Sequence, residues 1–260
     1  MKLLKGKKIL ITGITNERSI AWGIAKILYK EGAELGCIVQ NKKIRKKIKY
    51  FIEEIKPNML LICDVSNDQS IKKLFIDVNC IWKNFDGLVH SIAYCPKEQL
   101  SQDIFNNITR SAFNTTHEIS SYSFLAMIKE CRHMLNKNSS LVTLSYIGSQ
   151  KVISHYHLMG LAKASLESNV RYLASILGEK CIRVNAISSG PIKTTSSYII
   201  KDFNKFKKYC ESFYFIKKDI TSLEIGNVTA FLSSDLSNGI TGSIIYVDHG
   251  FHASRINSFL

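Results

Sequence analysis

Two tyrosines and a lysine occur close together in SYIGSQKVISHYHLMGLAKASLESNV, residues 145–170. Tyr146 is near the start of this segment, and Tyr156 and Lys163 are seven positions apart. On a helix, seven positions bring two side chains to nearly the same face, about 10.5 Å apart along the axis. A phenol donates a hydrogen bond and an ammonium group carries a positive charge, so both can act on a substrate oxygen. The spacing allows a catalytic pair, and it also fits two ordinary residues on a helix with one buried side.

The register of this pair differs from that of the common carbonyl-reducing short-chain dehydrogenases. Their pattern is Tyr-x-x-x-Lys, with a serine thirteen positions before the tyrosine. Anchored on Lys163, this pattern requires a tyrosine at position 159 and a serine at position 146, where this chain has Met159 and Tyr146. The sequence therefore disfavours an alcohol dehydrogenase or a ketoreductase, and it leaves Tyr156 as the candidate phenol.

The elements that must position these residues alternate between strand-like and helix-like segments. Apolar runs predict strands at residues 7–13, 33–40, 59–65, 85–94, 139–146 and 242–250, and a strand followed by a loop at residues 181–192. Helical periodicity occurs after Tyr146 and at residues 19–32, 41–50, 68–82, 115–135 and 222–235. This alternation predicts one α/β domain over residues 1–260, a Rossmann-like doubly wound parallel sheet of about seven strands with helices on both faces. Ligands of such sheets bind beyond the carboxyl ends of the strands.

Composition argues against several other classes of protein. The chain has 260 residues, of which 45% are hydrophobic, and no run of 18 uninterrupted apolar residues, so we expect no membrane-spanning helix. The N-terminal residues continue directly into a strand-like segment without a cleavage site, so we expect no signal peptide. Seven cysteines without CxxC spacing indicate mostly buried free thiols in the cytoplasm and argue against a metal site.

The net charge of +14 makes nucleic acid a partner to consider. The excess is mostly lysine, and the densest run, NKKIRKKIKY at residues 41–50, places Ile44 and Ile48 four positions apart. This pattern is typical of an amphipathic surface helix with a solvated basic face, so we expect no nucleic-acid partner.

The segment after the first predicted strand, ITGITNERSIAWGIA, contains part of a dinucleotide-binding turn. Gly13 matches the first glycine of the GxGxxG fingerprint, but the next glycine is Gly23, so the motif is incomplete. Gly13 would let the turn approach a ligand closely. Ser19, at a plausible N-cap, and Ile20 begin a helix whose first amide groups could bind a pyrophosphate. The turn alone also fits an ordinary β–α connection.

Residues after the next predicted strands could complete a cofactor site. Gln40 follows the second strand, where NAD-binding proteins usually have an acidic residue, and lysines follow it. A neutral amide can bind the ribose hydroxyls and nearby lysines could favour a 2′-phosphate, so the sequence leaves NADH and NADPH both open. The other candidate contacts, at the carboxyl ends of the third and fourth strands, are Asp64, Val65, Ser91, Ile92 and Ala93.

The chain as a whole resembles the bacterial NADH-dependent enoyl-acyl-carrier-protein reductases, a divergent branch of the short-chain dehydrogenase/reductase family. The similarity covers, in order, ITGITNERSIAWGIA, the strand end at Gln40, CDV, FDGLVHSIAY, HEISSYSFLAM, TLSY, the helix with Tyr156 and Lys163, RVNAISSGPIKT and GSIIYVDHGF. The resemblance implies reduction of the trans-2 double bond of an enoyl thioester by NADH, the last step of the fatty-acid elongation cycle, with NADPH not excluded.

The resemblance also implies a role for each member of the candidate pair. Tyr156 would donate a hydrogen bond to the thioester oxygen, where charge develops as an enolate. Lys163 would hold the hydroxyl groups of the nicotinamide ribose and tune the tyrosine. Tyr146 would line the site with a supporting role. The implied catalytic residues are therefore Tyr156, Tyr146 and Lys163.

The resemblance implies further contacts after the sixth predicted strand, in SSGPIKTTSSYIIKDFNKF. The implied cofactor contacts are Pro191, Ile192, Lys193, Thr194, Thr195 and Ser196. Residues 194–210 would form a mobile lid that closes over the acyl chain and excludes water. The implied substrate-binding residues are Tyr94, Cys95, Tyr146, Tyr156, Met159 and Phe203.

The resemblance further implies acyl carrier protein as a partner and a homo-oligomer, most often a tetramer. Because acyl carrier proteins are acidic, basic residues near the lid are a candidate docking surface, namely Lys201, Lys205, Lys207 and Lys208. Two alternatives remain open. A short-chain reductase acting on a carbonyl is disfavoured by Met159, and a non-catalytic nucleotide-sensing protein of the same fold is supported only by the net charge.

Overall fold

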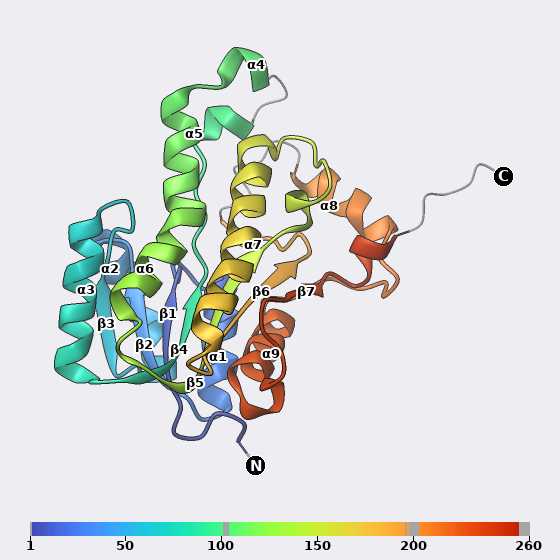
Figure 1. Ribbon diagram of the computed structural model, residues 1–260. Coiled ribbons are helices and arrows are strands. Elements are labelled where there is room, and N and C mark those ends of the chain that lie inside the picture. The colour runs from blue at the N-terminus through green and yellow to red at the C-terminus, as the bar shows by residue number, and fades with distance from the viewer. Residues whose placement is uncertain (1, 101–103, 196, 198–202, 255–260) are drawn as a thin grey trace.

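Seven strands form one parallel sheet in the order β3-β2-β1-β4-β5-β6-β7 in this computed structural model (Figure 1). Their bounds are β1 Lys8–Thr12, β2 Glu34–Val39, β3 Met59–Ile62, β4 Phe85–His90, β5 Leu135–Ser145, β6 Arg183–Ser189 and β7 Ile244–Val247. The structure describes residues 2–100, 104–195, 197 and 203–254. The chain returns from β3 at one edge to β4 beside β1, so the strand order reverses between β1 and β4. The predicted doubly wound parallel sheet is confirmed.

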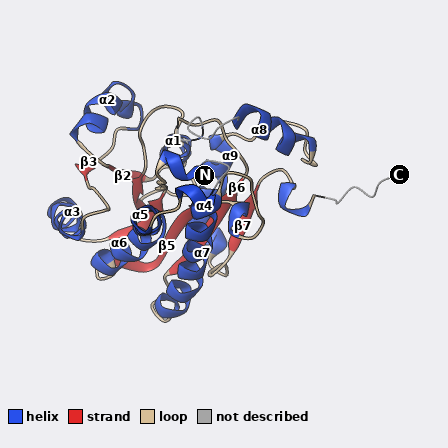
Figure 2. Cartoon of the chain, turned by 90° about the horizontal axis from the view of Figure 1, so that it is seen from above, coloured by secondary structure: helices blue, strands red, loops and turns tan. Residues whose placement is uncertain are grey.

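Helices cover both faces of this sheet (Figure 2). Their bounds are α1 Ile20–Lys30, α2 Lys42–Ile52, α3 Asp68–Ile81, α4 Ile104–Asn107, α5 Arg110–His117, α6 Ser123–Cys131, α7 His157–Gly178, α8 Phe203–Ser212 and α9 Ser222–Ser233. One hydrophobic cluster joins the sheet to α3, α6 and α7. The other joins it to α1, α2 and α9. The sheet is therefore the middle layer of three.

Alternation along β1 shows why the strands are apolar without interruption. Leu10 packs in the cluster with α3, α6 and α7, whereas Ile9 and Ile11 pack in the cluster with α1, α2 and α9. All three side chains are buried. Because successive residues of a strand point to opposite faces, a sheet covered on both sides requires apolar residues at every position.

The helix expected at residues 115–135 differs from the prediction. It is divided into α5 and α6 by a π-helical turn, Glu118–Tyr122, and α6 ends at Cys131. Within this turn the Ser120 hydroxyl accepts a hydrogen bond from the Tyr94 N–H and donates one to the Tyr94 carbonyl, each at 2.9 Å. The turn thereby holds the loop after β4, a tertiary contact that apolar periodicity does not reveal.

Part of the expected lid is a helix. Residues 203–212 form α8, on which Phe203 and Cys210 are buried and Phe206 is half-buried. These apolar residues recur at i, i+3 and i+7, which is the pattern of one helix face packed on the protein. The expected lid, residues 194–210, therefore includes the first eight residues of α8, while residues 196 and 198–202 lie outside the described residues.

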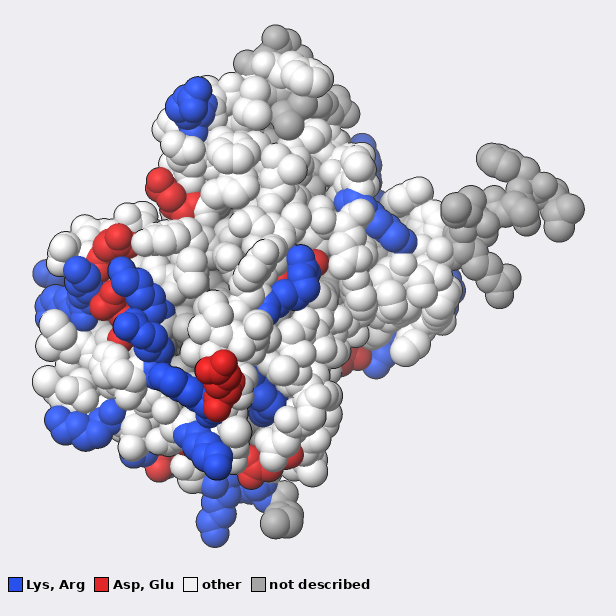
Figure 3. Space-filling model, viewed as in Figure 1, with Lys and Arg blue, Asp and Glu red and all other residues white. Residues whose placement is uncertain are grey.

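The basic segment at residues 41–50 forms the amphipathic surface helix that its sequence predicted. Asn41 caps α2 by accepting a hydrogen bond from the Ile44 N–H, and Ile48 is buried while the lysines of α2 are exposed. Figure 3 shows Lys and Arg gathered mainly over the lower left of one face, whereas the upper part of that face has few charged residues. Among the described residues, no helix combines the length and the apolar character needed to cross a bilayer.

The cysteines are all free, and four of the seven are buried. Cys37, Cys63, Cys131 and Cys210 are buried, Cys95 is half-buried, and Cys80 and Cys181 are exposed. Burial raises the pKa of the Cys37 thiol to about 12. The four buried thiols therefore serve as packing groups in the core rather than as nucleophiles.

Candidate active site

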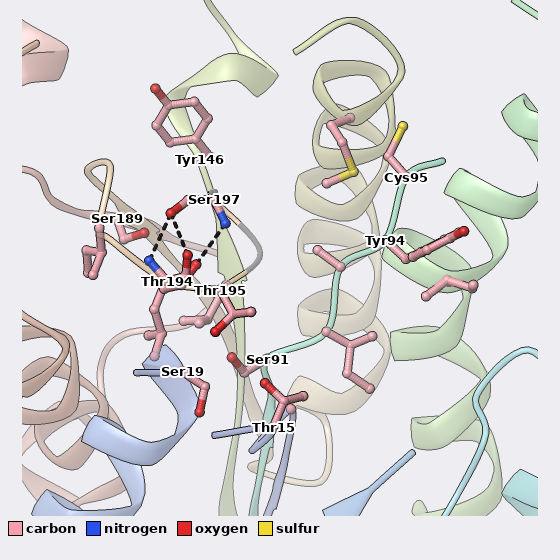
Figure 4. Close-up of a pocket in the computed structure, with 18 of the residues that line it drawn as sticks. Thr15, Ser19, Ser91, Tyr94, Cys95, Tyr146, Ser189, Thr194, Thr195 and Ser197 are labelled. Carbon is pink, nitrogen blue, oxygen red and sulfur yellow. Dashed lines mark hydrogen bonds between the residues drawn. The ribbon is translucent and has the colours of Figure 1, made fainter. Parts of the chain in front are cut away.

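A cavity of about 630 Å³ opens at the carboxyl ends of the strands. Almost every residue predicted for the site lines it: Gly13, Ser19, Ile20, Gln40, Asp64, Val65, Ser91, Ile92, Ala93, Tyr94, Cys95, Tyr146, Tyr156, Met159, Lys163, Pro191, Ile192, Thr194, Thr195 and Phe203. Lys193 is exposed and does not line the cavity, and Ser196 lies outside the described residues. Figure 4 shows several of these side chains converging on the cavity from different strands.

The turn after β1 lies unusually close to the end of β4. Gly13 has φ +88°, and a Cβ added there would lie 1.9 Å from the Ser91 carbonyl oxygen. Thr12 joins the same two strands, because its hydroxyl donates to the Val89 carbonyl at 3.2 Å and accepts from the Ser91 N–H at 3.1 Å. Glycine is therefore required at position 13, and the turn leaves room for a ligand against its backbone.

The start of α1 is open toward the cavity. Ser19 occupies the N-cap position, as predicted, but its side chain makes no capping hydrogen bond and instead donates to the Asn16 carbonyl at 2.7 Å. The first amide groups of α1 therefore lack a side-chain cap. Together with the partial positive charge of a helix N-terminus, they suit a pyrophosphate.

The strand ends beyond this turn contribute polar groups at one side of the cavity. Gln40 is exposed at the end of β2. Asp64 follows β3, and its Oδ1 atom accepts hydrogen bonds from the Ser66 N–H at 3.1 Å and the Ser66 hydroxyl at 2.7 Å. These contacts hold the Asp64 carboxylate in place at the end of the strand, where a ligand group can meet it.

Tyr146 and Tyr156 form an aromatic pair inside the cavity. Their ring centroids are 4.9 Å apart and the rings are inclined by 72°, an edge-to-face arrangement. Tyr146 directly follows β5, and Tyr156 is the N-cap residue of α7. The Tyr146 hydroxyl is buried without a hydrogen-bond partner. Burial raises the pKa of both phenols, so both are protonated donors near neutral pH.

Lys163 is the buried cation of the site. The side chain is 4% exposed, and its Nζ atom donates a hydrogen bond to the Leu144 carbonyl oxygen at 2.7 Å. Burial lowers the pKa of Lys163 from 10.5 to about 8, and the Glu167 carboxylate acts in the opposite direction. The Lys163 ammonium group, held by this short hydrogen bond, therefore lines the same cavity as the two phenols.

The segment after β6 closes the cavity on a further side. The Thr194 N–H donates to the Ser197 hydroxyl at 2.8 Å, and the Ser197 N–H donates to the Thr194 hydroxyl at 3.1 Å, forming a compact turn (Figure 4). Phe203 and Phe206 of α8 add an apolar wall. The described part of the expected lid thus combines a polar turn with an aromatic helix.

One of the four lysines predicted for the docking surface near the lid is not on the surface, so the prediction is wrong for that residue. Lys207 is 5% exposed and forms ion pairs with Glu211 and with Asp219, the latter at 2.8 Å. Its charge is thus used within the protein, and it anchors α8 to the loop before α9. Lys205 and Lys208 are exposed, and Lys201 lies outside the described residues.

Several cavity residues were not predicted from the sequence. The unpredicted residues that lie near predicted ones include Thr12, Ile14, Thr15, Asn16, Leu144, Ser145, Ser189 and Ser197. Leu100 and Ile119 come from segments without any site motif. His155 has φ +63° and a buried Nδ1 atom without a hydrogen-bond partner. Its place directly before Tyr156 is the signal that could have identified it.

Comparison with known proteins identifies the family. A family model described as "Enoyl-(Acyl carrier protein) reductase" matches residues 13–252. The protein named enoyl-[acyl-carrier-protein] reductase [NADH] FabI from Buchnera aphidicola subsp. Schizaphis graminum is 64% identical over 260 residues, which is 100% of both chains. The protein of the same name from Escherichia coli K12 is 48% identical over 257 residues, covering 99% of this chain and 98% of that protein.

A solved structure agrees with these matches. The crystal structure of enoyl-[acyl-carrier-protein] reductase (NADH) from Aquifex aeolicus VF5 superposes with a TM-score of 0.93 at 39% identity, and the match covers 99% of this chain and 100% of that chain. The fold, the family model and the full-length relatives lead to one conclusion. The chain belongs to the family of enoyl-acyl-carrier-protein reductases.

Proposed function

We propose that this chain reduces the trans-2 double bond of an enoyl thioester carried by acyl carrier protein, using NADH. The observation that carries the proposal is that Tyr156 and Lys163 line one cavity, while Met159 occupies the position of a carbonyl-reductase tyrosine. The full-length relatives are named as NADH-dependent enoyl reductases, which supports the same reaction. The free cysteines further support action in the reducing cytoplasm.

The cavity fits a dinucleotide cofactor. Gly13 provides a turn without a side chain, and the uncapped start of α1 suits the pyrophosphate. Gln40 and Asp64 line the same cavity, and we propose that they hold the ribose and the adenine. When bound, NADH supplies the hydride that is transferred to the β-carbon of the enoyl thioester.

We propose separate roles for the three polar residues of the reaction centre. The Tyr156 phenol donates a hydrogen bond to the thioester oxygen and stabilises the charge that develops there. The Lys163 ammonium group holds the hydroxyl groups of the nicotinamide ribose. Tyr146 packs edge-on against Tyr156 and limits the orientations of its ring. Of these three residues, only Tyr156 is proposed to stabilise the transition state directly.

The acyl chain would occupy the apolar end of the cavity. Met159, Ile119 and Leu100 line it from one side, and Phe203 and Phe206 line it from α8. We propose that residues 194–210 act as a lid that closes on the chain and excludes water, with Lys207 anchoring the base of α8. Exclusion of water strengthens the hydrogen bond from Tyr156 to the thioester oxygen.

A direct assay tests the proposed activity. The wild-type protein should oxidise NADH, followed by absorbance at 340 nm, when crotonyl thioester of acyl carrier protein is added, and NADH should be used faster than NADPH. Acetoacetyl thioester, which offers a carbonyl to reduce, should give only the background rate because Met159 replaces the required phenol. Turnover of acetoacetyl thioester without turnover of crotonyl thioester would instead establish the carbonyl-reductase alternative.

We propose that the active form is a homotetramer. One apolar surface is made by exposed residues of α5, α6 and α7: Phe113, Leu125, Leu161, Tyr172 and Ile176. A second lies at the β7 edge of the sheet, where Leu223, Phe231 and Leu236 are exposed. Two self-complementary surfaces generate a tetramer with perpendicular two-fold axes.

Light scattering coupled to size-exclusion chromatography checks this proposal. We expect a mass about four times that of the 29.4 kDa chain. Tyr172→Glu should reduce the assembly to dimers, because it places a charge in the α5–α7 surface without affecting the second surface. A monodisperse monomer for the wild type would contradict the proposed tetramer.

A further inference from the structure

Glu167 is a buried carboxylate that the proposed reaction does not use. It lies one helical turn after Lys163 on α7 and is 4% exposed. Its Oε1 atom accepts hydrogen bonds from the Ser145 and Ser149 hydroxyls, each at 2.6 Å, and its Oε2 atom accepts one from the Gln150 side-chain amide at 3.3 Å. Ser145 is the last residue of β5, and Ser149 and Gln150 belong to the turn between β5 and α7. By accepting these three hydrogen bonds, the Glu167 carboxylate holds the turn in place.

The turn held by Glu167 contacts the reaction centre. It contains Tyr146, and its Gly148 lies so close to Tyr156 that an added Cβ would be 2.5 Å from the Tyr156 Cδ1 atom. Gly160 of α7 also lies close to the turn, because a Cβ added at Gly160 would be 2.7 Å from the Gly148 carbonyl oxygen. Movement of the turn would therefore displace both phenols.

Glu167 also acts on the buried ammonium group. Burial of Lys163 disfavours its charged form, and Glu167 is the nearby charge that favours it. His90 of β4 faces Lys163 as well, but burial, and then the Lys163 charge, lower the pKa of His90 to about 3, so His90 is neutral. The charge balance around Lys163 consequently depends on Glu167.

The other titratable groups near this pair do not replace the carboxylate. Burial raises the pKa of Tyr146, Tyr156 and Tyr246, so these phenols are neutral near pH 7. Tyr246 of β7 donates from its hydroxyl to the Gln150 side-chain oxygen at 2.9 Å, which extends the network. Asp248, after β7, acts on Tyr146 and Tyr246, and its carboxylate accepts hydrogen bonds from His252.

We propose that Glu167 is a positioning residue of the reductase, which keeps Lys163 charged and fixes the turn that carries Tyr146 against Tyr156. This inference rests on the proposed function, because it assigns Glu167 a task only through the residues that would meet cofactor and substrate. It makes two separable claims, one electrostatic and one geometric.

The electrostatic claim is tested in the protein without cofactor or substrate. With ¹³Cε-labelled lysine, and the Lys163 resonance assigned by its loss in Lys163→Met, the titration midpoint of Lys163 is measured by NMR in the wild type and in Glu167→Gln. We expect Glu167→Gln to lower the midpoint by about one pH unit. Glu179→Gln, which removes an exposed carboxylate beyond the end of the same helix, should leave it unchanged.

Cofactor binding provides a second readout of the same claim. At pH 7.5 the dissociation constant for NADH, measured by fluorescence titration, should rise about threefold in Glu167→Gln, since the charged fraction of Lys163 would fall from about three quarters to about one quarter. At pH 6 the two proteins should bind NADH similarly. A Lys163 midpoint that does not move in Glu167→Gln overturns the electrostatic claim.

The geometric claim is tested with Ser149→Ala, which keeps the charge of Glu167 and removes one short hydrogen bond. We expect kcat with crotonyl thioester to fall about fivefold, with little change in KM for NADH and no change in the Lys163 midpoint. An unchanged kcat overturns the claim. This variant also keeps the inference testable should Glu167→Gln fail to fold, since circular dichroism identifies that failure.

The tests separate this inference from the proposed function. If the wild type showed no enoyl turnover while the Lys163 midpoint still shifted in Glu167→Gln, the proposed reaction would be wrong and the coupling of Glu167 to Lys163 would stand. If the wild type turned over crotonyl thioester and neither variant differed from it, the role assigned to Glu167 would be wrong and the reaction would stand.

Discussion

Replacing Tyr156 by phenylalanine should lower kcat with crotonyl thioester about 100-fold, because removal of one hydrogen-bond donor from a developing oxyanion typically costs a factor of 10² to 10³. That factor corresponds to about 3 kcal/mol of transition-state stabilisation. The phenylalanine ring keeps the edge-to-face contact with Tyr146, so the packing of the pair should persist. KM for NADH should stay close to the wild-type value, because the phenol is not proposed to bind the cofactor. Steady-state kinetics at saturating NADH measure the effect.

Tyr146→Phe is the matched control for this prediction. It removes the same hydroxyl group from the other ring of the pair, and that hydroxyl is buried without a partner in the structure. We expect a much smaller loss of kcat, together with a melting temperature equal to or above that of the wild type, since an unpaired buried hydroxyl is unfavourable. If Tyr146→Phe were the more damaging change, the roles proposed for the two tyrosines would have to be exchanged.

Replacing Lys163 by methionine should raise the dissociation constant of NADH about 30-fold, because a hydrogen bond from a charged group contributes about 1.5 to 3 kcal/mol. The same change should not destabilise the folded protein. Methionine has a similar volume, and it removes the cost of burying an ammonium group that donates a hydrogen bond to the Leu144 carbonyl. Fluorescence titration with NADH and thermal denaturation measure the two effects. Lys180→Met, at an exposed position beyond α7, is the control.

The pH dependence of stability should distinguish the same variant. Burial lowers the pKa of Lys163 in the folded protein to about 8, whereas the ordinary pKa of lysine is 10.5. Between these values the unfolded chain binds more protons at this residue than the folded chain, so Lys163 makes the wild type more stable as pH rises through this window. Lys163→Met should lack this contribution. An identical pH dependence of stability in both proteins, or undiminished NADH affinity in the variant, would contradict the buried charged state.

The sequence predicted which residues line the cavity best where those residues closely follow strands. Gly13, Gln40, Asp64, Ser91 and Tyr146 all belong to such positions, and parallel strands bring their carboxyl ends to one edge of the sheet. Order along the chain is then enough to predict proximity. The alternation of apolar strands and helices fixed the fold class for the same reason.

Residues that depend on tertiary contacts could not be predicted in this way. Ser120 holds the Tyr94 backbone through a π-helical turn, which departs from the regular helix period. Lys207 looked like a surface charge until Glu211 and Asp219 were placed beside it. Glu167 sits in an unremarkable helical sequence, and only the turn packed against it reveals its task. Such partners come from segments that are distant in the sequence. Hydrophobic periodicity does not specify which of these segments pack together.

The central claim, that Tyr156 and Lys163 serve reduction of a conjugated double bond, is tested most directly by following the transferred atom. The wild type is incubated with crotonyl thioester and with NADH deuterated at both C4 positions, and the product is examined by mass spectrometry. We predict a butyryl thioester with one deuterium at its β-carbon and a solvent-derived hydrogen at the α-carbon. Crotonyl thioester recovered without deuterium, while acetoacetyl thioester acquires deuterium as a 3-hydroxybutyryl product, would contradict the assignment.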